Sequence, residues 1–358
     1  MLDKVINAVE TSSDEFILIT KIIDRLLVLG VGDDDASLRS CVFSSITPSL
    51  DLVVSRSRNI NYILEAQNDE FISVRTSSMS ILSRISHYDA IHLMPFIRLS
   101  LTKLMRQLQS SKDQQIRQES VMLIQSIVKG STTQMVPYVK GIFEALLKLL
   151  DDPVLKDDPR GPAVVGASLN TIGELAVASP DSIRDHLHQV FPMIIEALQD
   201  NSFADKQESA VIALGKIVRS LGMVSEPYAE YPELFESLVQ VIQRTEDEFS
   251  NLRIQAIKTI GILGVVEQNK FEEYLLHIDA EIDKEKDLED VPDILAADAE
   301  DDEDEVMKLD RYYLSVIIKS LMKILRDDSL HHHHQSAAIV AVNIVKILGK
   351  LVKYYDSI

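Results

Sequence analysis

The chain has 358 residues, of which 46% are hydrophobic and only 6% aromatic, with 12 glycines and 11 prolines. So few turn-forming residues over this length favour a helical fold and argue against one built from many strands. The formal net charge of −20 disfavours binding to phosphate backbones and to anionic lipid surfaces. We therefore expect an all-α protein that binds no nucleic acid and does not insert into membranes.

Cysteine content and apolar runs bear on the compartment. The single cysteine, Cys41, excludes an internal disulfide and is typical of a reducing environment. The most apolar stretch, 16–31, contains Lys21, Asp24 and Arg25, so it is too short for a membrane span of about 20 residues. The amino terminus also lacks the pattern of a secretory signal. These features predict a cytoplasmic location, with the nucleus or the surface of endomembranes as alternatives.

One pattern recurs along the chain. Its reference position is occupied in order by Arg39, Arg75, Arg117, Val165, Gln207, Arg253 and Gln335. Four residues later stand Phe43, Met79, Val121, Leu169, Val211, Ile257 and Ile339, and seven residues later Ile46, Leu82, Ile124, Ile172, Leu214, Ile260 and Val342. These offsets share one face of an α-helix, and the residue at offset three is nearly always small. Each copy therefore predicts an inner helix with a buried apolar face.

A second helical stretch precedes each inner helix. These outer stretches are 16–29, 62–67, 91–109, 135–150, 186–199, 231–243 and 312–325. Acidic turns lead into the inner helices, where Asp and Asn can accept hydrogen bonds from unpaired N–H groups. The first six reference positions lie 36 to 48 residues apart, and two helices per copy at this period are typical of HEAT units. The sequence thus predicts an α-α superhelix of the HEAT/armadillo type with about seven hairpins and a continuous core. A pair of globular helical bundles is the alternative.

Two segments interrupt the pattern. Residues 151–162 contain three prolines and are expected to form an extended loop. Residues 279–305 hold fifteen acids against Lys284 and Lys286, a net charge of −13, which predicts disorder. The acidic segment is interpreted as a solvated spacer, as a docking strip for a basic partner, or as a competitor for basic patches of the chain itself. The expected organisation is a solenoid of about six repeats over 1–278, an acidic insertion over 279–308 and a seventh hairpin over 309–358.

Residues that could support chemistry do not form a recognisable site. In the run His331 to His334 only the first and last share a helical face, which is a weak metal signal. His186 and His188 are expected at the surface or at the boundary between surface and core. Cys41 is expected to be a buried structural thiol rather than a nucleophile. The chain shows none of the nucleotide-binding or catalytic-loop motifs of kinases, so we expect no catalytic, cofactor-binding or metal-binding residue, no cofactor and no small-molecule substrate.

Two further features bear on packing. Gly173, Gly215 and Gly261 stand at the same offset in three inner helices, which predicts close approach of neighbouring helices, with hinge glycines as the alternative. The stretch from Tyr228 to Phe235 could present exposed aromatic side chains to a partner or could pack between repeats; packing is the favoured interpretation.

Several segments in fixed order resemble one known family, the target of rapamycin kinases, in their HEAT-repeat region. The segments that carry this resemblance are 35–43, 68–75, 171–176, 213–218 running on to 226–234, 256–264 and 324–334 with its histidine run. Together they cover about residues 15–350. One departure is the acidic segment, because the family tends to have a serine-rich linker there.

The resemblance implies a non-catalytic arm of a serine/threonine kinase complex. In that family the solenoid shapes a dimeric assembly and offers surfaces to scaffold subunits such as raptor, and the assembly couples nutrient signals to growth control. The family's kinase and rapamycin-binding regions have no counterpart in these residues, and the chain is expected to stop within a solenoid. A HEAT-repeat transport receptor or a stand-alone adaptor is the alternative function.

Overall fold

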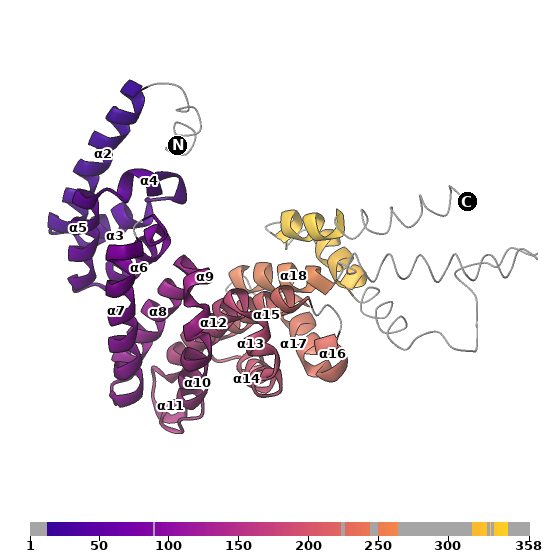
Figure 1. Ribbon diagram of the computed structural model, residues 1–358. Helices are drawn as coiled ribbons and strands as arrows, with labels where there is room; N and C mark the ends of the chain where they lie inside the picture. Colours follow the sequence, from indigo (N-terminus) through magenta and orange to yellow (C-terminus); the bar gives the residue numbers. More distant parts are fainter. Residues whose placement is uncertain are drawn as a thin grey trace, which may run out of the picture. The chain divides into compact units, whose positions relative to one another are not determined.

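The computed structural model describes residues 13–88, 90–222, 226–243, 250–263, 317–327, 330 and 333–342 (Figure 1). These residues form α-helices and short 3₁₀ turns joined by tight connections, without any strand among them. None of the described helices has both the length and the apolar character needed to cross a bilayer. The chain divides into two compact units, Met1–His186 and Leu187–Ile358.

The first unit contains four helical hairpins and their connections. Its elements are α2 (Ser13–Gly32), α3 (Ala36–Ser44), η1 (Pro48–Leu50), α4 (Asp51–Val54), α5 (Ser57–Glu65), η2 (Ala66–Asn68), α6 (Ile72–Ile85), α7 (Ala90–Ser110), α8 (Gln114–Gly130), α9 (Thr132–Met135), η3 (Val136–Tyr138), α10 (Val139–Leu150), α11 (Val154–Asp157), α12 (Gly161–Ala178) and α13 (Pro180–Arg184). The inner helices α3, α6, α8 and α12 pack on one another in series, and α2, α5, α7 and α10 are the outer helices of the four hairpins.

The second unit continues the same alternation. Its elements are α14 (Leu187–Gln199), α15 (Ala204–Leu221), α16 (Glu226–Glu230), α17 (Pro232–Gln243) and α18 (Ser250–Leu263), followed by helical residues 317–326 and 333–342. The inner helix α15 packs along α18, and the outer helices α14 and α17 contact each other. The all-α fold of repeated HEAT-type hairpins expected from the sequence is confirmed.

Burial of the recurrent apolar positions explains why the hairpins stack. At offset seven Leu82, Ile124, Ile172 and Leu214 are all fully buried. Full burial of such a side chain contributes about 1.5–3 kcal/mol, and an isolated hairpin would leave much of this surface exposed. The apolar seam therefore stabilises each unit through contacts between consecutive inner helices.

Acidic residues cap two of the inner helices as predicted, whereas α6, α12 and α15 begin without a side-chain cap. The Asp35 carboxylate accepts a hydrogen bond from the Ser37 N–H at 2.9 Å at the start of α3. The Asp113 carboxylate does the same for the Gln115 N–H at 2.8 Å at the start of α8. Each bond satisfies a donor that the first helical turn leaves unpaired.

The glycine prediction is confirmed at two of its three positions. A Cβ atom added to Gly215 would lie 2.8 Å from Thr259 Oγ1, and one added to Gly261 would lie 2.9 Å from a methyl group of Val340. Both distances are shorter than an ordinary van der Waals contact. Glycine is thus required where α15 meets α18 and where α18 meets the helix 333–342.

The prediction for 151–162 is wrong in part. The segment is not a continuous extended loop, because α11 forms within it and α12 already begins at Gly161. Pro153 is the N-cap of α11, and Pro162 lies in the first turn of α12. Proline is tolerated in these positions, since the first helical N–H groups have no intrahelical partner.

The register predicted for the seventh inner helix is also wrong. Ile339 and Val342, expected to be buried, are 55% and 50% exposed, whereas Ala337 and Val340 are buried. His333 is only 2% exposed and takes the reference position that the sequence pattern gave to Gln335. The buried face therefore begins two residues earlier. The predicted acidic insertion 279–308 lies outside the described residues. Both of its predicted boundaries with the flanking repeats also lie outside them.

Candidate interaction surface

Arginines at the reference position connect consecutive hairpins in the first unit. Each donates to a carboxylate of the next hairpin, and the pairs are Arg39 with Asp69 at 2.7 Å, Arg75 with Glu119 at 2.5 Å and Arg117 with Asp152 at 2.7 Å. Each arginine also donates to backbone carbonyl groups at the turn of its own hairpin. The guanidinium groups thus hold one turn against the next.

The aspartates in these pairs, Asp69 and Asp152, are held ionised. The hydrogen bond from Arg117 keeps the pKa of Asp152 below its ordinary value. Burial would raise the pKa of Asp69, but hydrogen bonds from the Arg39 guanidinium and from the Phe71 N–H outweigh burial, and the net pKa is lowered. Since hydrogen bonds to the charged form favour ionisation, these residues stabilise the stack. Their charges are not directed at an external ligand.

A polar groove crosses three inner helices of the first unit. It is a hollow of about 370 Å³ along α3, α6 and α8, lined by Phe43, Ser44, Ile46, Thr76, Ser77, Ser80, Ile81, Arg84, Met122, Gln125, Ser126 and Lys129. We call this hollow the hydroxyl groove. Arg84 is held in place because its Nε donates to both carboxylate oxygens of the buried Asp51, at 2.9 and 2.8 Å. The groove therefore presents hydroxyl groups and two cations on a rigid base.

The second unit carries a groove of opposite charge. A hollow of about 630 Å³ lies between α14 and α17 and is lined by Pro192, Ile195, Glu196, Gln199, Asp200, Tyr231 and Glu233. The Tyr231 ring packs edge-on against Phe191, with centroids 5.4 Å apart. Lys206 Nζ lies 2.9 Å from the Asp200 carboxylate and keeps the pKa of Asp200 below its usual range. This surface would suit a cationic segment of a partner, whereas the hydroxyl groove offers hydrogen bonds.

The structure distinguishes the interpretations of several residues singled out in the sequence. Cys41 is exposed, so the prediction of a buried thiol is wrong; it lies on the face of α3 opposite Val42 and Phe43. Tyr228 is fully buried and packs edge-on against Phe235 with centroids 5.9 Å apart, so the packing interpretation is confirmed for these two residues, whereas the half-buried Tyr231 lines the groove of the second unit. His186 stacks on Phe143 with centroids 5.1 Å apart, as expected of a boundary residue.

The two described histidines of the run, His333 and His334, begin the helix 333–342 and have different surroundings. His333 is buried, and His334 Nε2 lies 3.0 Å from the carbonyl oxygen of Asp327. His331 and His332 lie outside the described residues. Over the part of the chain that the structure describes, no three His, Cys, Asp or Glu side chains come together as metal ligands.

The sequence pattern did not predict the grooves, although it identified Phe43 and Ile46 as apolar repeat positions. Ser44, Ser80 and Ser126 are far apart in sequence and come together only through the stacking of α3, α6 and α8. Ser44 and Ser80 stand at the same offset, but the third copy has Met122 there, so the repeat pattern gave no signal for the groove.

Comparisons with known families agree with this architecture. A family model described as importin subunit beta-1-like, TPR repeats matches residues 61–289, and one described as serine/threonine-protein kinase mTOR domain matches residues 224–358. The structure of yeast importin-beta (Kap95p) is 17% identical, with a TM-score of 0.50 over all of this chain and 43% of that one. The karyopherin Kap121p, bound to the extreme C-terminus of the phosphatase Cdc14p, is 16% identical with a TM-score of 0.50, over 97% of this chain and 36% of that one. These structures share the fold.

Proteins related in sequence identify the family more specifically than the solved structures do. The serine/threonine-protein kinase TOR of rice is 30% identical over 326 residues, which are 86% of this chain and 13% of the relative. TOR2 of Saccharomyces cerevisiae is 27% identical over 350 residues, 98% of this chain and 14% of the relative. The chain thus spans about one-seventh of the length of these kinases. With importin-β1-like helical repeats as its architecture, the chain belongs to the target of rapamycin family and corresponds to part of the HEAT-repeat region of those kinases.

Proposed function

We propose that the chain is a non-catalytic scaffold segment of a TOR-like serine/threonine kinase. It mediates protein–protein interactions and assembly of the TOR complex in nutrient and growth signalling. The observation that carries this proposal is the match to TOR kinases over 86–98% of the chain, together with grooves built across consecutive helices. Phosphotransfer would then belong to other parts of such a kinase and not to these residues.

The partners we propose are raptor-like scaffold subunits and other components of the TOR complex, and the location is the cytoplasm. The hydroxyl groove is the contact surface that suits this role best in the first unit. Its lining combines side-chain hydroxyls with the apolar Ile81 and Met122 and the cations Arg84 and Lys129. Protein interfaces combine apolar contacts with directed hydrogen bonds in this way.

The proposal is tested by direct binding between purified proteins. The full chain is immobilised, and its affinity for a purified raptor-like subunit is measured at physiological salt. We expect specific binding that weakens at least tenfold in the double variant Ser77→Arg/Ser80→Arg, because two long charged side chains would fill the groove. The matched control is Thr102→Arg, on an exposed position of α7.

Thermal unfolding of both variants checks that they remain folded. Binding no tighter than to an unrelated protein of similar charge would contradict the scaffold role. Tight binding to a GTP-loaded small nuclear GTPase instead of the raptor-like subunit would favour the transport-receptor alternative.

A further inference from the structure

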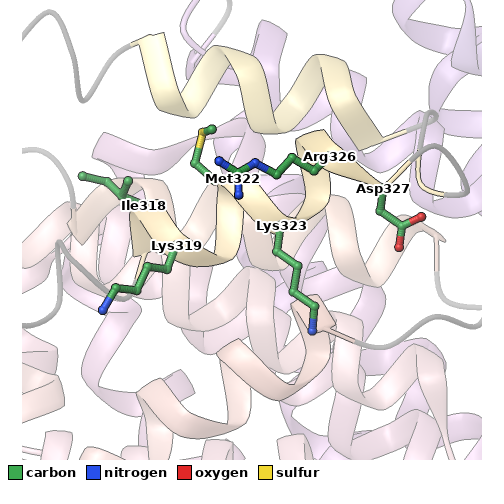
Figure 2. Close-up of a pocket in the computed structure, with 6 residues that line it drawn as sticks. All are labelled: Ile318, Lys319, Met322, Lys323, Arg326 and Asp327. Atoms are coloured by element: carbon green, nitrogen blue, oxygen red, sulfur yellow. The ribbon is translucent and has the colours of Figure 1, made fainter.

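The outer helix of the seventh hairpin, residues 317–326, is anchored through one face only. Ile317, Leu321 and Ile324 are at most 2% exposed and fix the helix to the second unit. The opposite side contains two adjacent rows of exposed residues (Figure 2). We call this side the two-row face.

One row of the two-row face is apolar and the other is cationic. Ile318 and Met322, one helical turn apart, are 38% and 40% exposed. Lys319 and Lys323, also one helical turn apart, form the adjacent row. Arg326 stands four residues after Met322, and Figure 2 shows its side chain beside Met322. All three cations are exposed. Among the described residues none of these three cations lies within ion-pair distance of a carboxylate. On a chain with a net charge of −20, these three positive charges thus have no ion-pair partner among the described residues.

The two-row face also borders a concavity. Ile318, Lys319, Met322, Lys323, Arg326 and Asp327 line an open hollow of about 620 Å³, and Figure 2 shows the lysine side chains extending from the helix toward the same side. A hollow of this size matches a short peptide stretch. At the carboxyl end of the helix the Asp327 carboxylate would repel an acidic ligand, so such a ligand would not extend over that end. An acidic peptide would therefore lie along the Lys319 and Lys323 end.

A segment of the same chain has the complementary pattern. Residues 287–295 read Asp-Leu-Glu-Asp-Val-Pro-Asp-Ile-Leu, so they contain four acids and four large apolar residues and no cation. They lie within the segment 279–305, whose net charge is −13. The acids match the cationic row, and the leucine, valine and isoleucine side chains match the apolar row. We propose that residues 287–295 bind the two-row face of helix 317–326.

Covalent connection favours this occupant over a separate acidic protein. Twenty-one residues, 296–316, lie between the segment and the helix. At about 3.5 Å per residue they can reach any point on the helix, which is about 15 Å long. A tethered ligand at this separation has an effective concentration of the order of millimolar. Single exposed ion pairs contribute about 0–1 kcal/mol, so binding depends on several pairs together with apolar burial and weakens with salt.

Cross-linking of the full chain is the first test. A carbodiimide joins a lysine amine to a carboxylate in contact with it, and peptide mass spectrometry locates the links. We expect Lys319 and Lys323 to link to acids within 287–293 at low salt, and the yield to fall at 0.3 M salt. Lys103 and Lys140, exposed lysines on α7 and α10, are the matched controls and should link to that segment at least tenfold less. Equal yields at the controls would overturn the proposal.

A peptide titration separates the specific pattern from charge alone. In a variant whose residues 279–305 are replaced by a Gly/Ser sequence of equal length, a labelled 285–297 peptide should bind at least tenfold more tightly than it binds the wild-type chain. A peptide with the same composition but with the acids grouped together should bind at least fivefold more weakly. Equal binding of the two peptides, or of one peptide to both proteins, would overturn the proposal.

Charge reversal shows whether the contact is made at the two-row face. Lys319→Glu/Lys323→Glu in the Gly/Ser variant should abolish peptide binding, while Lys103→Glu/Lys140→Glu should leave it within twofold. Retained binding by the first double variant would contradict the assignment. Cross-links between isotopically labelled and unlabelled chains in a mixture would show binding to a second copy and would equally refute the intramolecular contact.

Discussion

Gly130 tests how closely the inner helices approach. A Cβ atom placed on this last residue of α8 would lie 2.6 Å from the Ser83 Cβ, 2.9 Å from the Ser80 carbonyl oxygen and 3.0 Å from the Arg84 N. Ordinary contacts begin near 3.5 Å, so α6 and α8 would have to separate by about 0.5–1 Å. Two of the three obstacles are backbone atoms, which cannot move aside by changing rotamer.

The expected cost for Gly130→Ala follows from two opposing terms. Overpacking of a fitted contact costs about 1–3 kcal/mol. Alanine recovers at most about 1 kcal/mol of helix propensity, and less at a helix terminus. We therefore expect a net destabilisation of about 1–2 kcal/mol, or roughly 2–8 °C in the melting temperature for a unit of this size.

The assay combines urea unfolding, followed by circular dichroism, with hydrogen exchange of peptides from α6 and α8. Local exchange is included because repeat arrays can unfold in parts. The matched control is Gly141→Ala in α10, where an added Cβ meets nothing within 4 Å. The control should be stabilised by about 0.5–1 kcal/mol. Equal stabilisation of both variants would refute the close approach of α6 and α8.

Three further predictions follow. Because hydrogen bonding to Arg117 lowers the folded pKa of Asp152, its contribution is present above the unfolded value of about 3.9 and is lost as pH falls through the folded pKa. Asp152→Asn should therefore cost about 1 kcal/mol in urea unfolding at pH 6 and nothing near pH 2. The exposed Cys41 should react with a thiol reagent in native buffer at one thiol per chain. Val340→Ala should cost about 1–3 kcal/mol, whereas Ile339→Ser should stay within about 0.5 kcal/mol, as measured by thermal unfolding.

A different result would contradict each of these three predictions. An Asp152→Asn penalty that persists at pH 2 would mean that the ion pair is not its source. A Cys41 thiol that reacts only in urea would restore the prediction of a buried residue. A larger loss for Ile339→Ser than for Val340→Ala would support the register expected from the sequence.

Periodicity predicted the parts of the fold where only one face of a helix is apolar. The helices that carry Ile124 and Leu214 have polar residues on another face, such as Gln118 and Glu208, so the apolar face and its burial could be read directly. Around 337–342 the sequence Ala-Ala-Ile-Val-Ala-Val is apolar on every side, and only packing reveals that Val340 and not Ile339 is buried. The exposed Cys41 stands two residues after the reference position Arg39, which is not one of the recurrent apolar offsets.

Prolines and grooves were less accessible to sequence reasoning. Pro162 was interpreted as a helix breaker, although it occupies the one turn where a missing N–H costs nothing. The hydroxyl groove depends on Ser44, Ser80 and Ser126, which only the stacking of successive hairpins brings together. The two-row face could have been recognised from its helical spacing, but its exposure depends on which face the hairpin buries.

Thiol accessibility along the shared seam is the most direct test of the stacked-hairpin architecture. In a Cys41→Ser background, a cysteine is introduced at Ile124 in the first unit, at Leu214 in the second, or at Leu99, which is 70% exposed. We predict that Leu99→Cys reacts at once in native buffer, whereas Ile124→Cys and Leu214→Cys react only when the protein is unfolded. Reaction of either seam cysteine as fast as Leu99→Cys in the folded protein would contradict the buried apolar seam within that unit.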